Sequence, residues 1–128
     1  MREDRVWLVT RGGEKPIAIE VAETEEEKAL GLMFRSSLAD DRGMIFHYGS
    51  PQEITMWMHN TYIPLDMVFI RDDGTVLRIE RRAQPLSDRI ISSQGPAIAV
   101  LELAGGAAER LGLQPGDRIR HPKWFPGR

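Results

Sequence analysis

Short runs in which apolar and polar residues alternate recur along most of this chain, and this pattern limits the fold more than any other feature. Alternation with a period of two residues is typical of β-strands that bury one face. Turn-forming residues separate the runs, and at Asp72-Asp73-Gly74 the Asp-Gly pair favours a hairpin. We also expect a turn at 49–51 and a polar loop at 85–94. Strands are predicted at 6–10, 17–21, 44–48, 54–58, 65–70, 76–80, 97–103 and 118–120.

Two segments favour helices. Thr24 and Glu27 form a T-x-x-E capping box, in which the two side chains bind backbone N–H groups at the helix start. A second helix is expected over 105–111, where Gly112 would end it in a left-handed conformation. Many strands with two short helices predict an α+β fold, built on a mainly antiparallel, barrel-like sheet. With 128 residues, the chain is expected to form one domain, residues 1–128.

The composition narrows the classes of function and partner. The formal net charge is -2 and the charges are mixed, so nucleic acid or an anionic membrane has no electrostatic support as a partner. The chain has no Cys, which removes disulfides, thiolate metal sites and a Cys nucleophile. No apolar run approaches the roughly 20 residues that span a bilayer, so no transmembrane segment is expected. No secretory signal peptide is visible behind Met1.

Motifs for metal or cofactor binding are not found either. His47, His59 and His121 are far apart in the sequence, and none forms an H-x-x-x-H or H-x-H pair. The methionines are expected to fill the core rather than bind copper. The sequence contains no G-x-S-x-G elbow and no glycine-rich phosphate loop. We therefore expect no metal and no cofactor.

The apolar run at 54–70 contains polar residues that two core strands do not require. A buried carboxylate at Asp66 would need N–H donors, a cation or a raised pKa. Two interpretations remain open. In the first, Asn60, Thr61 and Asp66 brace the turn at Pro64 through bonds to nearby backbone. In the second, polar groups line a small-molecule pocket with apolar walls, and its residues are Trp57, His59, Asn60 and Asp66.

The same run, WMHNTYIPLDMVFI, is similar to the signature of domain-of-unknown-function family 192, which usually reads aromatic-W-M-K-N-T-x-I-P-L-D. The segments GLMFR, GMIF, PAIAVLELAGG and GLQPGDRI also resemble family segments in the same order, so the resemblance covers about residues 16–120. His59 stands in place of the usual Lys, and Met56 in place of the usual aromatic residue. A positive charge at position 59 would therefore exist only below the histidine pKa.

The resemblance implies a compact α+β fold with a small barrel-like sheet, in an uncharacterised family of bacteria and archaea. Many members carry an export signal or a lipid anchor ahead of the domain. The resemblance therefore implies a periplasmic or otherwise exported protein if a leader has been trimmed, and a cytoplasmic one if not.

We expect a small ligand-binding or accessory domain, acting in the cell envelope if it is exported, with a small molecule as its partner. The residues predicted to line its site are Arg35, Trp57, Asn60, Thr61 and Asp66. Arg35 would offer a bidentate fork to a carboxylate or phosphate, and an internal Arg35–Asp66 ion pair is the alternative.

Two other hypotheses stay open. The first is a small enzyme with Asp66 or His59 as general base. The second is a structural or protein-interaction module that uses Trp124-Phe125 and an exposed strand edge. The sequence does not indicate an oligomeric state.

Overall fold

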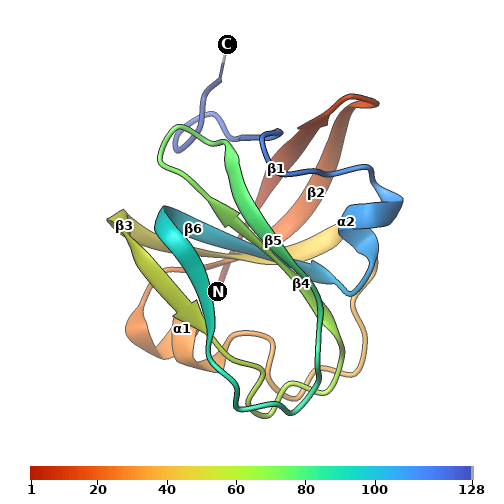
Figure 1. Ribbon diagram of the computed structural model, residues 1–128, viewed down its shortest axis with the longest axis vertical. Coiled ribbons are helices and arrows are strands. Elements are labelled where there is room, and N and C mark those ends of the chain that lie inside the picture. The colour runs from red at the N-terminus through yellow and green to blue at the C-terminus, as the bar shows by residue number, and fades with distance from the viewer. Residues whose placement is uncertain (128) are drawn as a thin grey trace.

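Seven strands and two short helices make up the fold of the computed structural model, which describes residues 1–127 (Figure 1). The strands form one sheet in the order β5-β4-β6-β3-β2-β1-β7. Neighbouring strands are antiparallel except β2 and β3, which pair in parallel. The predicted α+β fold is therefore confirmed. In chain order the elements are β1 (Arg2–Thr10), β2 (Gly13–Ala22), α1 (Glu25–Leu30), β3 (Arg42–Met56), β4 (Leu65–Ile70), β5 (Val76–Ala83), β6 (Ile91–Ala104), α2 (Ala107–Arg110) and β7 (Arg118–Arg120).

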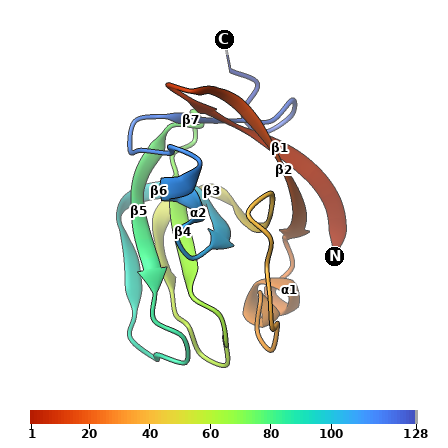
Figure 2. The same cartoon turned by 90° about the vertical axis from the view of Figure 1, so that its right-hand side faces the viewer.

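The sheet curls until its two outer strands meet, as the side view shows (Figure 2). Thr75 and Arg118 form an antiparallel bridge between the start of β5 and the start of β7. The N–H of Val76 donates to the carbonyl of Asp117, and the N–H of Ile119 donates to the carbonyl of Gly74, both at 2.8 Å. These bonds join the ends of the sheet, so the barrel-like shape expected from the sequence is confirmed.

The sheet encloses a first hydrophobic cluster, which we call the barrel core. Residues of both outer strands belong to this cluster, which shows that it lies on the inner face of the curled sheet. Both α2 and the C-terminal Phe125 pack against the same cluster. The barrel core consists of Val6, Leu8, Ile17, Ile19, Val21, Ile45, Val68, Ile70, Val76, Ala99, Leu101, Leu103, Ala107, Ala108, Leu113, Ile119 and Phe125.

A second cluster, the methionine-rich core, covers the other face of the central strands. Because it buries that face as well, all six residues of β4 are buried, and their side chains alternate between the two clusters. Leu32 and Met58, from the connections beside α1 and before β4, close this core from outside the sheet. The methionine-rich core consists of Ala22, Leu32, Met44, Phe46, Ile54, Met58, Leu65, Met67, Phe69, Ala83, Ile91, Ala97 and Val100.

Most local predictions hold. Both halves of the capping box at Thr24 and Glu27 are formed at the start of α1. Gly112 has a φ of 76°, and the next N–H, that of Leu113, donates to the carbonyl of Ala108 at 2.8 Å, which ends α2 as a Schellman motif does. No helix within residues 1–127 is long and apolar enough to cross a membrane.

Several boundaries differ from the prediction: β1 and β2 each begin four residues earlier than expected, at Arg2 and Gly13. Two further differences concern the β3–β6 pair. The segment 49–51 does not separate two strands but lies inside β3, where the register with β6 shifts between His47 and Gln52. A bulge of this kind lets a strand keep pairing through residues that would otherwise form a turn. The polar loop ends earlier than predicted, because β6 begins at Ile91.

Candidate functional site

Asp66, the polar residue inside the apolar strand β4, is fully buried and fully bonded. Its Oδ1 accepts hydrogen bonds from the backbone N–H groups of Arg82 at 2.8 Å and Gly106 at 3.0 Å. Its Oδ2 accepts one from the N–H of Ala108 at 2.9 Å. Gly106 is the N-cap of α2 and has no side chain to satisfy these donors. Asp66 therefore caps a helix 40 residues further along the chain.

This arrangement settles three predictions about Asp66. The expectation that it binds N–H donors is correct. The alternative Arg35–Asp66 ion pair is wrong, because both Arg35 Nη atoms bind the carboxylate of Glu20, at 2.7 and 2.9 Å. With no exposed surface and both oxygens engaged, Asp66 also cannot reach a substrate as a general base.

The five residues predicted to line one pocket do not converge. Trp57 and Thr61 line one cavity, together with His59. Arg35 borders a separate hollow of about 340 Å³. Asn60 has a φ of 53°, and its carbonyl accepts a hydrogen bond from the N–H of Phe34 at 3.0 Å. Asn60 therefore contributes to the structure through its backbone. A ligand-binding role for these residues stays a prediction.

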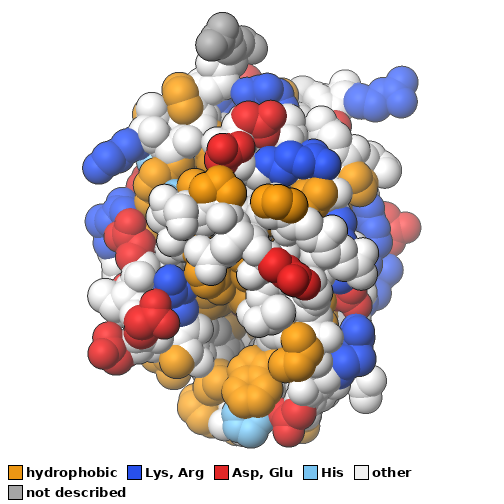
Figure 3. Space-filling view, turned by 60° about the vertical axis from the view of Figure 1, so that its left-hand side comes forward, with side chains coloured by type: hydrophobic (Ala, Val, Ile, Leu, Met, Phe, Trp, Pro, Cys, Tyr) orange, Lys and Arg blue, Asp and Glu red, His pale blue; other side chains and the backbone are white. Residues whose placement is uncertain are grey.

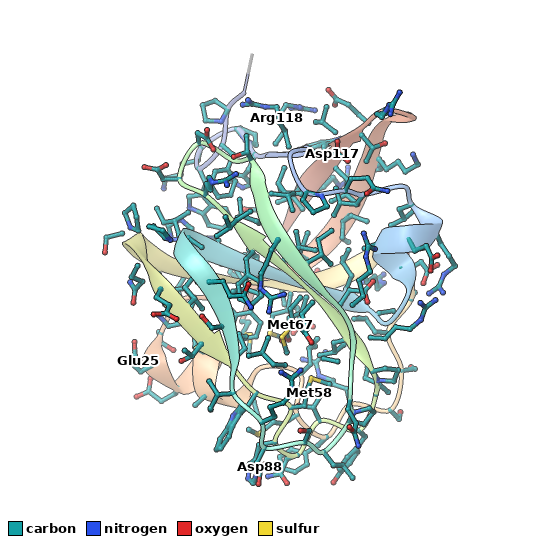
Figure 4. All side chains as sticks on the ribbon, in the orientation of Figure 1. Glu25, Met58, Met67, Asp88, Asp117 and Arg118 are labelled. Carbon is teal, nitrogen blue, oxygen red and sulfur yellow. The ribbon has the colours of Figure 1, made fainter. Side chains whose placement is uncertain are left out.

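The cavity that Trp57 and Thr61 share has a volume of about 120 Å³. It lies between the end of α1, the strand β3 and the connection that leads to β4. Phe46, Tyr48 and Met56 from β3 and Trp57 from the segment after it form apolar walls. Glu102 of β6 reaches the cavity from the centre of the sheet. In Figure 4 Met58 and Met67 lie in the core beside this region. The site thus combines apolar walls with a buried carboxyl group.

Glu102 is the unusual group of this site. It is 3% exposed, and its cross-strand neighbours are Met44 and Met67, so it faces the methionine-rich core. Its carboxyl group forms no hydrogen bond or ion pair within residues 1–127. No fully buried side-chain oxygen in these residues lacks a partner, so the carboxyl oxygens of Glu102 retain a small accessible surface, which borders the cavity. Burial in these surroundings disfavours the charged form and raises the pKa of Glu102 to about 8. At neutral pH the cavity therefore contains a protonated, unpaired carboxyl group.

Three other polar groups of the cavity, those of Tyr48, Lys28 and Thr61, have partners. The hydroxyl of Tyr48 donates to the Met56 sulfur at 3.6 Å, and burial raises the Tyr48 pKa to about 12. The Lys28 Nζ lies 4.2 Å from the centre of the Tyr48 ring and 3.4 Å from a Glu25 carboxylate oxygen. The Thr61 hydroxyl donates to the carbonyl of His59 at 3.1 Å. Glu102 is thus the buried carboxyl group of the cavity and has no partner among the described residues.

His59 sits at the outer part of the cavity. Its Nδ1 lies 2.8 Å from the Asp88 carboxylate, and its ring stacks on Trp57 with centres 4.6 Å apart. Since a carboxylate only accepts, Nδ1 donates, and Nε2 of the neutral ring is an acceptor. The side chain is 41% exposed. Asp88 lies at the lower end of the molecule in Figure 4, opposite Asp117 and Arg118.

Exposed hydrophobic side chains surround this end of the molecule, and we call them the apolar rim. They come from α1 and from the connections that meet at the lower end in Figure 1, and hydrophobic side chains gather there in Figure 3. Two of them, Phe34 and Tyr62, touch edge to face with centres 5.9 Å apart. The apolar rim consists of Leu30, Phe34, Trp57, Tyr62, Leu86 and Ile90.

The C-terminal Trp124-Phe125 pair, predicted as a contact surface, packs against the domain itself. Phe125 is 2% exposed and belongs to the barrel core. Trp124 stacks between the rings of His47 and His121, with centres 4.9 and 4.2 Å apart. These side chains therefore stabilise the fold rather than project from it.

Sequence reasoning missed Glu102 although a signal was present. Glu102 lies in the apolar strand 97–103, as Asp66 lies in the apolar strand 65–70. The cost of burying a carboxylate marks both positions equally.

Comparisons with protein families and with solved structures place the chain among known proteins. The model of domain-of-unknown-function family 192, described as "Uncharacterized ACR", matches residues 7–121. A crystal structure from Sinorhizobium meliloti 1021, proposed to be a transcription regulator, is 43% identical, with a TM-score of 0.90 and 93% of each chain covered. A protein of unknown function from Novosphingobium aromaticivorans DSM 12444 is 41% identical, also with a TM-score of 0.90, over 93% of this chain and 85% of the other. No curated protein matches this chain.

Proposed function

The chain belongs to domain-of-unknown-function family 192, and we propose that its cavity beside Glu102 binds a small molecule. The observation that carries this proposal is the unpaired carboxyl group of Glu102, which is 3% exposed and borders the cavity. A buried polar group without a partner costs free energy, and a ligand that bonds to it recovers part of that cost. Strongly perturbed acids in a cavity are also common at binding and catalytic sites.

The size of the cavity limits what it can enclose. A volume of about 120 Å³ is a little below that of an engineered protein cavity of about 150 Å³ that binds benzene. The site therefore suits a molecule of that size, or one end of a larger molecule. The apolar rim beside the opening, which includes Trp57 and Leu30, offers contact area to the part that remains outside.

A thermal-shift screen of the whole chain tests this proposal. The library contains amines, alcohols, organic acids, sugars and short peptides, and Glu102→Gln serves as the matched control. A ligand present at a hundred times its Kd stabilises the native state by about 2.7 kcal/mol, so binding is readily visible. We expect at least one class to stabilise the wild type more than the variant. No stabilisation by any class, or equal stabilisation of both proteins, would contradict the proposal.

A second candidate function is catalysis with His59 as general base. The Asp88 carboxylate fixes Nδ1 as the donor and leaves Nε2 as an acceptor beside the cavity, a common arrangement of a catalytic imidazole. A screen of chromogenic esters tests it, with His59→Ala and Asp88→Asn as variants. Turnover that both substitutions reduce at least about a hundredfold would support the enzyme. Turnover that survives His59→Ala would exclude this base.

A further inference from the structure

We infer that the cavity selects an organic cation, a protonated primary amine with a short apolar substituent, whose ammonium group pairs with ionised Glu102. This inference rests on the proposed function and names the chemical class of its ligand. It follows from three features of the site: the charges that face Glu102, the aromatic walls and the volume of the cavity.

The charges around the cavity leave Glu102 without a cation. From α1, Lys28 faces the cavity, and its ammonium group is engaged by Glu25 and by the ring of Tyr48. From β3, Tyr48 is neutral at pH 7, and burial raises its pKa further, to about 12. From the connection to β4, His59 is held by Asp88. Among the described residues that line the cavity, Glu102 is thus the acidic group, and no cation pairs with it.

The walls of the cavity suit an ammonium group. Aromatic faces attract cations, and Phe46, Tyr48 and Trp57 all border the cavity. Lys28 demonstrates this attraction in the chain itself, because its Nζ lies 4.2 Å from the centre of the Tyr48 ring. A ligand ammonium has three N–H donors, and the Glu102 carboxylate oxygens can accept from them.

The volume favours a short substituent. About 120 Å³ accommodates an amine of roughly the size of n-butylamine, by comparison with the benzene-binding cavity of about 150 Å³. The polarisable side chains of Met33 and Met56 would contact its alkyl part. Longer substituents would have to leave through the opening and lie on the apolar rim.

Binding of a cation must displace the proton of Glu102. The carboxyl group is protonated at pH 7 because its pKa is about 8, whereas an alkylamine, like lysine, keeps its charge up to about pH 10. The complex needs the carboxylate, so about 0.9 proton is released per ligand at pH 7. For the same reason the apparent Kd should fall about ninefold from pH 6 to pH 7 and about fivefold from pH 7 to pH 8.

Three probes of matched size and different charge test the inference: n-butylamine, 1-butanol and butyrate. Each is titrated into the whole wild-type chain at pH 6, 7 and 8, and binding is followed by changes in backbone amide NMR shifts. We expect n-butylamine to bind at least about tenfold more tightly than the other two at pH 7, with the pH dependence given above. Shifts around Tyr48, Trp57 and Glu102 would locate the site.

Two variants sharpen the result. Glu102→Gln should weaken n-butylamine at least about tenfold and remove the pH dependence, because the amide has no charge and no proton to release. Lys28→Gln should leave n-butylamine binding equal or stronger, since a like charge is removed. If Glu102→Gln does not fold, the preference of the wild type for n-butylamine over 1-butanol and butyrate still tests the inference.

Several outcomes overturn the inference. Tighter binding of butyrate than of n-butylamine, together with loss of butyrate binding in Lys28→Gln, would show that the site prefers anions. Loss of n-butylamine binding in Lys28→Gln would also contradict the inference. Equal binding of all three probes would make it non-selective for charge. If no probe binds while another class in the broad library stabilises the wild type more than Glu102→Gln, the ligand class is wrong but the proposed function stands. A library without any ligand, or one whose ligands stabilise both proteins equally, removes both.

Discussion

Asp66 and Glu102 occupy neighbouring positions in the sheet and opposite chemical situations. In the β4–β6 pair, Asp66 is opposite Leu103, and Glu102 is opposite Met67, one residue away. Both carboxyl groups are buried. Asp66 accepts three backbone hydrogen bonds, whereas Glu102 has no partner within residues 1–127. Burial alone therefore does not tell a structural carboxylate from an available one; its partners do.

The alternation of side chains along the strands explains the difference. Leu103 belongs to the barrel core, so Asp66 points to the inner face, where the start of α2 presents its N–H groups. Met67 belongs to the methionine-rich core, so Glu102 points to the outer face, where thioethers and aromatic rings offer no donor. Successive side chains of a strand point to opposite faces of the sheet. One face therefore offers backbone N–H donors to Asp66, whereas the other face places Glu102 beside an apolar cavity.

The largest expected effect comes from Asp66→Ala. This substitution leaves two buried N–H donors and one partly buried donor without an acceptor, at about 1–3 kcal/mol each, so we expect a loss of about 4 kcal/mol in the free energy of unfolding. Asp66→Asn should lose about half as much, because its amide oxygen can still accept from Arg82 and Gly106. Urea unfolding measures both. A loss below about 1 kcal/mol for Asp66→Ala would show that the capping role is wrong.

The next effect concerns the pH dependence of stability and isolates Glu102. Its pKa rises from 4.5 in the unfolded chain to about 8 in the native state, so the native state binds more protons between these values. Stability from this group is therefore complete below about pH 4.5 and is lost as the pH rises to 8. From pH 5 to pH 8 the loss should be roughly 3 kcal/mol.

Glu102→Gln supplies the control for that measurement. The variant keeps the shape of the side chain but cannot ionise, so its free energy of unfolding should be flatter over the same pH range. The difference between the two curves cancels the contributions of all other titrating groups. Parallel curves for wild type and variant would mean that the carboxyl group is solvated or paired in the native state.

A smaller effect is expected from Gly106→Ala, which alters the backbone of the Asp66 site. Gly106 has a φ of 88°, and an added Cβ would meet the flexible ends of Arg110 and Arg82 at 2.6 and 2.7 Å. The left-handed conformation costs an alanine about 1–2 kcal/mol. Gly116→Ala is the matched control, since its φ is 91° and the added Cβ meets nothing within 4 Å. In thermal unfolding, the Tm of Gly106→Ala should be equal to or lower than the Tm of Gly116→Ala.

The smallest effect is predicted for Arg82→Ala. Asp66 binds the backbone N–H of this residue, which alanine retains. Among residues 1–127 the guanidinium group pairs only with Glu109, at 3.2 Å and with both side chains more than half exposed. Exposed pairs contribute little, so the free energy of unfolding should change by less than about 1 kcal/mol. A loss as large as that of Asp66→Ala would mean that the side chain, and not the backbone, holds Asp66.

The sequence predicts what local chemistry determines. The capping box at Thr24 and the Asp-Gly hairpin depend on residues within one turn of each other, and both form as predicted. The parallel pairing of β2 with β3 and the bulge inside β3 were not predicted, because neighbours distant in the sequence impose them.

The same division applies to the candidate site. The expectation that Asp66 would bind N–H donors was correct, but the donors lie 16, 40 and 42 residues away, beyond any local pattern. Arg35 was expected at the site and instead pairs with Glu20, a residue of β2 that only the folded sheet brings near. Glu102 carried the same sequence signal as Asp66, and only its lack of partners in the folded chain distinguishes it.

The positions of the two carboxyl groups also constrain how β4 can align with β6 during folding. Side chains alternate with a period of two, so a slip of one residue moves each of them to the other face. A slipped β4 would carry Asp66 away from the N–H groups of α2 and into the methionine-rich core, while Met67 would face those N–H groups without an acceptor. Misaligned pairings therefore lose three hydrogen bonds and bury a second unpaired acid. The helix cap at Asp66 thus favours the native alignment of β4 with β6. Chains with a misaligned β4 should unfold and refold rather than persist.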